Sequence, residues 1–141
     1  NYVEQSDERF DYYHKTEERL KFDLQYFNRI TKGGLPPKTL NVALAGTGVG
    51  KSLFMCHVAA SMISQGKNVL YITLEMAEER IAERIDANLL DVTIDELYDM
   101  PKKYYDDKIK KMQSKVQGQL IIGPDPDPGG CAVAPAGNFA S

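Results

Sequence analysis

Residues 40–52 read LNVALAGTGVGKS, and this stretch decides the fold. Its first part, Leu40–Ala45, is short, apolar and followed by a glycine-rich turn, which is typical of a buried strand. Its second part, residues 45–52, matches the phosphate-binding pattern G-x-x-x-x-G-K-[ST], with Ala45 in place of the first glycine. Because that pattern joins a strand to a helix, the stretch predicts an α/β domain that binds a nucleotide.

The residues of this loop suit a triphosphate. Glycines at 46, 48 and 50 allow backbone N–H groups to turn inward without a Cβ clash, and the positive end of the following helix points at the same place. Lys51 would reach the β- and γ-phosphates, and the Ser52 hydroxyl would hold Mg²⁺. The alternative is a glycine-rich turn with Lys51 and Ser52 there by chance. The residues predicted to bind the nucleotide are Gly46, Thr47, Gly48, Val49, Gly50, Lys51 and Ser52.

Helix and strand patterns continue after the loop. An amphipathic helix is predicted over residues 53–65, with Gly66 as its C-terminal cap. Residues 69–74 are rich in the β-branched and aromatic types that favour strands. Strands 40–45 and 69–74 should therefore be parallel and joined by a right-handed crossover, which predicts an α/β fold with a mostly parallel sheet.

The following residues extend this alternation. Apolar residues recur at helical spacing over 81–89 and again over 105–116, and residues 120–122 predict a third strand. Thr93 and Glu96 have the spacing of a capping box, which predicts a short helix between the two longer ones.

Composition divides the chain into a polar lead (1–21), a body of strands and helices (22–122) and a tail (123–141). The 19 residues of the tail include four Gly, four Pro and four Ala, so we expect it to be irregular or disordered, or to be non-native sequence. The lead predicts a short helix with a thin apolar stripe that a small domain would leave uncovered. That stripe is Phe10, Tyr13, Glu17 and Leu20.

The body is predicted to open with a helix capped by Asp23. Phe22 and Phe27 flank this cap with the spacing of a hydrophobic staple. The helix should stop at Gly33-Gly34, because glycine adopts the left-handed conformation that ends helices.

Glu75 is a second candidate for chemistry. It follows the predicted strand 69–74, and ligands of open α/β sheets bind outside the carboxyl ends of the strands. A carboxylate there could orient and deprotonate the water that attacks a γ-phosphate. It could equally be an exposed acid at the start of the next helix, where negative charge is favourable.

Composition excludes several classes of protein. The 141 residues carry 17 Lys and Arg against 20 Asp and Glu, a net charge of -3, which argues against binding nucleic acid through bulk charge. Six lysines over 102–115 are interpreted as a solvated helix face. The sequence has no apolar run long enough for a membrane helix or signal peptide, and its two cysteines indicate neither a disulfide framework nor a zinc site. We expect a cytoplasmic protein.

The remaining polar residues are given structural roles. His57, on the helix after the loop, is interpreted as a structural residue and Cys56 as a small buried one. Arg80 and Arg84 are predicted to form surface ion pairs with neighbouring glutamates.

In order and spacing, six short segments resemble the RecA-like motor domain of DnaB-type hexameric replicative helicases, with the greatest likeness to the T-even phage members. The resemblance covers residues 22–122, and Ala in place of the first loop glycine is familiar in that family. The segments are Phe22-Asp23-Leu24, Asn28-Arg29-Ile30-Thr31, Gly33-Gly34-Leu35, Leu40–Ala45, Gly46–Ser52 and Leu74-Glu75-Met76.

The resemblance implies that Lys51 and Ser52 bind ATP or another nucleoside triphosphate with Mg²⁺, and that Glu75 is the catalytic glutamate. It implies 5′ to 3′ translocation of a homohexamer on single-stranded or forked DNA, with a primase and a helicase loader as partners. It also suggests that the lead is a linker helix that packs on the adjacent subunit, and that a phage-encoded form would act in the host cytoplasm.

The sequence also departs from a complete motor. The acidic residue that holds Mg²⁺ through water, the DNA-binding loops and the arginine finger are not found in it, so we expect a fragment with weak hydrolysis or none. Two other readings stay open: a RecA-type strand-exchange or clock ATPase, and a non-catalytic interaction module gated by nucleotide.

Overall fold

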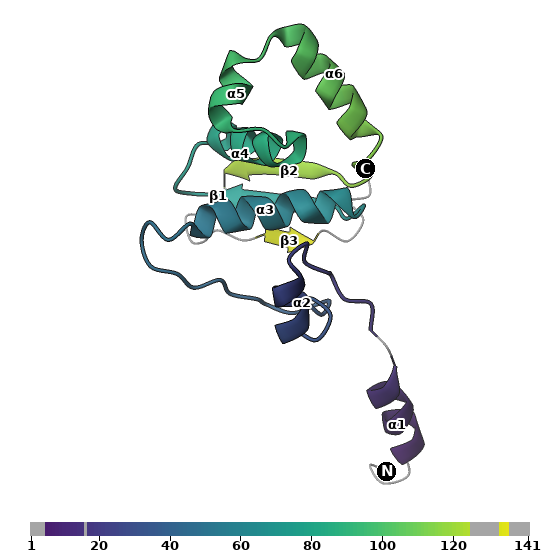
Figure 1. Cartoon of the computed structure of the whole chain (residues 1–141). Coiled ribbons are helices and arrows are strands. Elements are labelled where there is room, and N and C mark those ends of the chain that lie inside the picture. The colour runs from purple at the N-terminus through teal and green to yellow at the C-terminus, as the bar shows by residue number, and fades with distance from the viewer. Residues whose placement is uncertain (1–4, 16, 125–132, 136–141) are drawn as a thin grey trace. The chain divides into compact units, whose positions relative to one another are not determined.

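The computed structural model describes residues 5–15, 17–124 and 133–135 (Figure 1). The chain forms two compact units, Asn1–Asn41 and Val42–Ser141. The boundary between them lies inside the stretch that was predicted to form the first strand. No helix in the described part of the chain has the length and apolar character needed to cross a bilayer.

The first unit begins with α1 (Ser6–His14), which is shorter than the predicted stripe requires. Glu17 and Leu20 lie beyond the helix, so the prediction of one stripe from Phe10 to Leu20 is wrong. Leu20 instead forms an antiparallel bridge with Leu35, in which each backbone N–H donates to the other residue's carbonyl over 2.8 Å. This pairing satisfies the backbone of Leu20 in an extended conformation, which a helix would not allow.

The second helix, α2 (Gln25–Ile30), is capped differently from the prediction. Leu24, not Asp23, is the N-cap, and its side chain makes no capping bond. The Asn28 side chain reaches back instead, accepting the Phe22 N–H over 2.7 Å and donating to the Phe22 carbonyl over 2.6 Å. The predicted contact between Phe22 and Phe27 is confirmed, with ring centroids 5.4 Å apart.

The turn after α2 requires glycine, as predicted. Gly33 and Gly34 have φ values of 109° and 116°, which L side chains rarely adopt. A Cβ at Gly34 would also collide with the carbonyl of Leu20 in the bridge.

The second unit contains a three-stranded sheet with the order β2-β1-β3. β1 pairs with β2 in parallel, with Val69 opposite Leu120, and with β3 in antiparallel orientation, with Val69 opposite Pro135. Its elements are α3 (Lys51–Ser64), β1 (Val69–Thr73), α4 (Glu78–Leu90), α5 (Ile94–Asp99), α6 (Lys102–Gln113), β2 (Leu120–Pro124) and β3 (Val133–Pro135). The predicted α/β class and the strands at 69–74 and 120–122 are confirmed. The sheet is mixed, not mostly parallel.

The predicted strand Leu40–Ala45 is not formed. Leu40, Val42 and Leu44 alternate along this segment and expose 90%, 77% and 95% of their surface. Among the described residues, β1 already has a neighbour on each side, so the segment has no sheet edge at β1 to join. The predicted crossover from residues 40–45 to 69–74 is therefore wrong; the parallel pair is β1 with β2, and α4 to α6 lie between them in sequence.

The tail predicted to be irregular contributes to the sheet. β2 extends through Gly123 and Pro124, and β3 lies within the tail at residues 133–135. Pairing with β1 supplies the backbone hydrogen bonds that the Gly/Pro/Ala composition does not predict. The other tail residues, 125–132 and 136–141, lie outside the described part of the chain.

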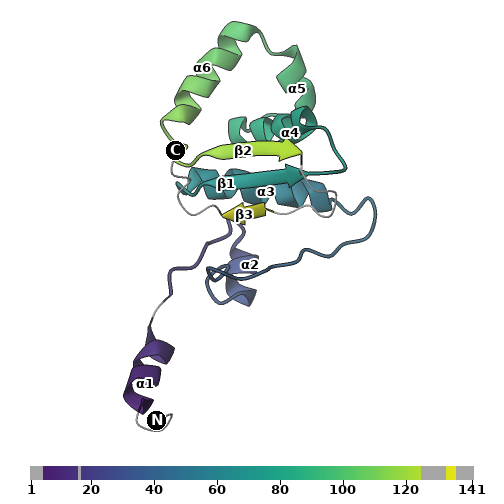
Figure 2. The same cartoon turned by 180° about the vertical axis from the view of Figure 1, so that it is seen from behind.

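The core lies between α3, α4 and one face of the sheet. Figure 1 shows α3 in front of β1, and Figure 2, from behind, shows the strands in front of α3. Burial alternates along β1, so that one face of the strand packs inward and the other is half-buried. The largest fully buried side chains are Tyr71, Ile81, Ile85, Val69 and Cys56.

The capping box predicted at Thr93 is confirmed by its hydrogen bonds. Thr93 caps α5: its hydroxyl accepts the Glu96 N–H over 3.2 Å, while its own N–H donates to the Glu96 carboxylate over 2.7 Å. Gln65 is the C-cap of α3, and Gly66, which was predicted as the cap, is the next residue, with the left-handed φ of 77°. Gly118, before β2, donates its N–H to the Ile63 carbonyl over 3.1 Å, and a Cβ there would collide with the Lys67 carbonyl.

Candidate functional site

The glycine loop (residues 45–52) runs directly into α3. Gly50 is the N-cap of this helix with φ 98°, and Gly48 has φ 74°. Both values lie in the left-handed region, which glycine alone adopts without strain. No atom lies within 4 Å of the place where a Cβ would stand on either residue, so the backbone at these two positions faces open space. The loop therefore has the left-handed glycine backbone and the unobstructed surface that a phosphate-binding loop needs.

α3 offers an anion the positive end of its dipole. The helix is 14 residues long and its first turn contains no acidic residue, so none of its own carboxylates neutralises the N-terminal N–H groups. It is held in place by buried residues along its second half, among them Val58, Met62 and Ile63. The backbone N–H donors at the start of α3 are therefore held by a helix that packs into the core.

Lys51 and Ser52 are the first two residues of α3. Lys51 is exposed and Ser52 is half-buried. This arrangement places one ammonium group and one hydroxyl at the start of the helix, where the free N–H groups are. Among the described residues there is no group of three or more His, Cys, Asp or Glu that could hold a metal ion. A cation here would depend on the Ser52 hydroxyl and on the oxygens of a bound phosphate.

Glu75 is exposed and lies two residues after the end of β1. The turn that carries it is closed by Thr73, whose hydroxyl donates to the Met76 carbonyl over 2.8 Å and accepts the Met76 N–H over 3.3 Å. Among the described residues, Thr73 is the only polar or charged one that is buried, with 7% of its surface exposed. Nothing in the sequence alone singles it out, because its role depends on which face of β1 is buried.

The fold brings the glycine loop and Glu75 to the same edge of the sheet. Figures 1 and 2 both show that α3 begins at the end of the sheet where β1 and β2 terminate. This is the carboxyl edge of the parallel pair, where α/β proteins bind ligands. The glycine loop and Glu75 therefore lie at the sheet edge where they were expected, although the strand predicted to precede the loop is not formed.

His57 and Cys56, within α3, contact the neighbouring elements α4 and β1. His57 Nδ1 lies 3.0 Å from the Asn88 amide nitrogen on α4. Since an amide N–H₂ only donates, Nδ1 is the acceptor in this pair. Cys56 is 2% exposed, and its Sγ lies 4.0 Å from the Tyr71 hydroxyl. Both contacts agree with the structural roles predicted for these residues.

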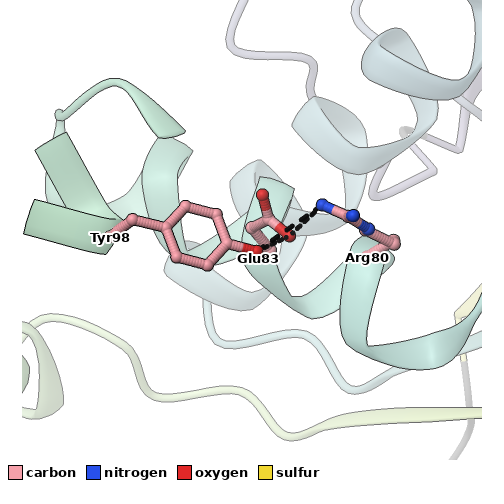
Figure 3. A network of polar contacts seen from close by, with 3 residues as sticks. All are labelled: Arg80, Glu83 and Tyr98. Carbon is pink, nitrogen blue, oxygen red and sulfur yellow. Dashed lines mark hydrogen bonds and ion pairs between the residues drawn. The ribbon is translucent and has the colours of Figure 1, made fainter. Parts of the chain in front are cut away.

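A polar network joins α4 to α5 (Figure 3). Arg80 and Glu83 form the predicted ion pair, with nitrogen and oxygen 3.2 Å apart. Tyr98 donates to the same Glu83 oxygen over 3.0 Å, and this bond raises the pKa of the Tyr98 phenol. The ion pair follows from helical spacing, whereas Tyr98 is fifteen residues away in sequence and only the fold places it there.

A groove of about 470 Å³ lies between α4, α5 and the first turns of α3. It combines apolar side chains with charged ones of both signs, and it shares no residue with the glycine loop. Its lining includes Leu53, Arg84, Asn88, Asp91, Ile94 and Glu96.

Comparison with known proteins finds a replicative helicase and two DNA repair proteins that are similar to this chain. It is 49% identical over 107 residues to the DnaB-like replicative helicase of Enterobacteria phage T4, an alignment covering 74% of this chain and 22% of that protein. It is 33% identical over 85 residues to the DNA repair protein RadA of Listeria monocytogenes, covering 60% and 18% of the two chains. It is also 33% identical over 73 residues to the DNA repair protein RadA of Campylobacter jejuni, which covers 50% of this chain and 16% of that protein.

The resemblance to DnaB-type helicases is thus confirmed, and the chain spans about a fifth of the length of these relatives. The AAA domain family matches residues 6–125, which include α1 and α2, the glycine loop, Glu75 and β2. Since this match covers most of the sequence, the chain belongs to the AAA domain family.

Proposed function

We propose that this chain is the nucleotide-binding part of a RecA-like motor in a replicative DNA helicase. The motor hydrolyses ATP or another nucleoside triphosphate and uses the energy to move 5′ to 3′ along single-stranded DNA and to separate the duplex. The observation that carries the proposal is the pair of left-handed glycines at the start of α3, on the same sheet edge as Glu75. The 49% identity to a replicative helicase supports the choice of this activity.

Binding of the triphosphate follows from the groups at the start of α3. Backbone N–H groups of the glycine loop and the helix dipole attract the phosphate oxygens. Lys51 sets a positive charge beside the β- and γ-phosphates, and the Ser52 hydroxyl would hold Mg²⁺. Bound Mg²⁺ supplies further neutralisation of the phosphate charge.

In the hydrolysis step, Glu75 acts as the base that orients a water molecule. The water oxygen forms a bond to the γ-phosphorus, and the bond from that phosphorus to the oxygen bridging it to the β-phosphate breaks. The carboxylate takes a proton from the attacking water, and the nucleoside diphosphate leaves with its charge balanced by Lys51.

The assembly proposed from the family is a homohexamer that encircles single-stranded DNA in the cytoplasm, with a primase and a loader as partners. An arginine from the neighbouring subunit would complete each site. In that ring α1 would be the linker helix that packs on the adjacent subunit. The exposure of Phe10 and Tyr13 on α1, 60% and 70%, leaves aromatic surface for such a contact.

The direct test uses two substitutions in the full-length protein. Lys51→Ala should lower DNA-stimulated hydrolysis by about 100-fold or more, because it removes a charge that stabilises the transferring phosphoryl group. Glu75→Gln should retain nucleotide binding and lose hydrolysis. Wild-type turnover in Lys51→Ala would refute the site. Glu75→Gln with unchanged activity would instead indicate a module that only binds nucleotide.

A second candidate is an ATPase of DNA repair, and the similarity to two RadA proteins favours it. Such a protein would share the glycine loop and Glu75 but not the ability to open a fork. Unwinding of a forked DNA substrate by the full-length wild type supports the helicase. DNA-stimulated hydrolysis without unwinding favours the repair ATPase.

A further inference from the structure

The turn that carries Glu75 is held by one buried hydroxyl. Thr73 ends β1, and its Oγ1 bonds to both backbone groups of Met76: it donates to the carbonyl over 2.8 Å and accepts the N–H over 3.3 Å. Glu75 lies between these two residues. A hydroxyl can make both bonds because it is donor and acceptor at once.

The fold explains why this hydroxyl is committed to the turn. Val69, Tyr71 and Thr73 occupy the buried face of β1, so the Thr73 side chain is removed from water. A buried hydroxyl without a partner is costly, and the Met76 backbone groups are the partners it reaches. Leu74 and Glu75 are exposed and have little packing of their own, which leaves the Thr73 bonds as the main constraint on the turn.

We propose that Thr73 is the positioning residue for Glu75: its hydroxyl sets the Leu74–Met76 turn and thereby the direction in which the Glu75 carboxylate meets the attacking water. The inference rests on the proposed role of Glu75 in hydrolysis. A displacement of about 1 Å in a catalytic group can cost about 100-fold in rate. Loosening this turn should therefore affect the chemical step more than nucleotide binding, which belongs to the glycine loop.

The test compares Thr73→Val, which keeps the shape and removes the hydroxyl, with Thr73→Ser, which keeps the hydroxyl, both in the full-length protein. We expect Thr73→Val to lower kcat by about 10- to 100-fold while the Kd for a non-hydrolysable triphosphate changes by less than about twofold. Thr73→Ser should recover most of the rate. Wild-type kcat in Thr73→Val, or equal loss in folded Thr73→Ser, would overturn the inference.

A double-variant cycle separates positioning from a general structural effect. If Thr73 acts only through Glu75, the variant Thr73→Val/Glu75→Gln should be no slower than Glu75→Gln alone. A further loss of similar size in the double variant would show a role independent of Glu75. Should Thr73→Val fail to fold, Thr73→Cys takes its place, with an intermediate kcat expected and a wild-type kcat counting against the proposal.

Two controls distinguish the possible failures. Thr93→Val removes a hydroxyl that caps α5 outside the site, so it should lower Tm and leave kcat unchanged. A fall in kcat in this control as large as in Thr73→Val would make the effect one of stability and overturn the inference. If wild type itself does not hydrolyse triphosphate, or Glu75→Gln keeps full turnover, the proposed function fails first. If both of those behave as expected and Thr73→Val is fully active, only the inference about Thr73 fails.

Discussion

Tyr105 donates its phenolic O–H to Oδ2 of Asp86 over 3.3 Å, and this bond joins α6 to α4. Burial raises the pKa of the Asp86 carboxyl, and the bond from Tyr105 opposes that rise in part. Burial and the nearby Asp86 carboxylate also raise the pKa of the Tyr105 phenol. The folded structure therefore disfavours the ionised form of Asp86. This pair of residues lies outside the candidate site.

The raised pKa of Asp86 predicts a pH-dependent effect of Asp86→Asn. Because the folded-state pKa lies above the unfolded one, ionised Asp86 lowers stability above its folded pKa, and this penalty is absent below the unfolded value. Asp86→Asn keeps an acceptor for Tyr105 and removes the charge. We expect the variant to match or exceed the wild-type free energy of unfolding at pH 7, with the difference vanishing toward pH 3. Urea unfolding at several pH values measures this.

Tyr105→Phe is the matched control for that pair. It removes the donor and keeps the ring, so it should lower the free energy of unfolding by about 0.5 kcal/mol, a small value because the bond is long and partly exposed. A loss larger than about 2 kcal/mol would mean that the tyrosine has a packing role beyond this bond.

Gly50→Ala and Gly48→Ala should disturb the glycine loop through the backbone. An alanine at φ 98° or 74° costs about 1–2 kcal/mol, and its Cβ enters the open space in front of the loop. We expect binding of a fluorescent triphosphate analogue to fall at least 10-fold with the helix content unchanged by circular dichroism. Gly123→Ala on β2 is the stability control outside the loop, since no atom lies within 4 Å of the place where its Cβ would stand. Undiminished binding in Gly50→Ala would contradict a phosphate cradle at this loop.

Gly118→Ala tests the junction between α3 and β2. Its Cβ would collide with the Lys67 carbonyl and stand 3.0 Å from the Cα of Ile63, so the backbone must shift. The expected loss is about 1–3 kcal/mol in the free energy of unfolding, with nucleotide binding weakened only as far as folding is. Gly123→Ala, which lies within β2, has no atom within 4 Å of its Cβ and should cost much less. Equal losses in the two variants would contradict the close approach at Gly118.

The α5 capping box should be visible in the titration of Glu96. The Thr93 N–H and hydroxyl both donate to its carboxylate and lower the pKa of Glu96. A lowered folded-state pKa gives stability that is present above the unfolded value and is lost as pH falls through the folded one. In Thr93→Ala the Glu96 pKa should move up toward its ordinary value in an NMR titration, and unfolding should cost about 1 kcal/mol less. Thr93→Ser should leave both quantities near wild type.

Some features of the fold could be predicted because they depend on neighbours in sequence. The capping box at Thr93, the staple contact of Phe22 with Phe27 and the ion pair of Arg80 with Glu83 all join residues three to five apart. The prediction of Asp23 as a cap failed although it was also local: the helix begins one residue later, with Leu24 as its N-cap, and the side chain that bonds the preceding backbone is Asn28, which holds Phe22. Local sequence patterns identify the polar side chains that could bond to the backbone, but they do not decide which of them makes the bond.

Features that depend on pairing across the chain could not be predicted. The apolar alternation of residues 40–45 is correct for a strand, yet a strand forms only where it pairs with another one, and in the described part of the chain β1 pairs with β2 and β3 instead. Conversely, the composition of residues 133–135 does not suggest a strand, but β1 provides hydrogen-bond partners for them. The candidate site shows the same division: the loop glycines and Glu75 were proposed from motif and position, whereas Thr73 was not, and outside the site the bond of Tyr98 to Glu83 was not predicted either.

The sequence by itself determined the local backbone and charge of residues 45–52, on which the proposed phosphate site depends, because closely spaced glycines followed by Lys51 and Ser52 prescribe both wherever the loop lies. It also determined that Glu75 would follow a strand. Only the tertiary structure decided which face of β1 is buried, and hence that the Thr73 hydroxyl turns inward to hold the Glu75 turn. The reason is physical: backbone conformation is set by adjacent residues, while burial is set by segments far apart in sequence that meet only in the folded chain.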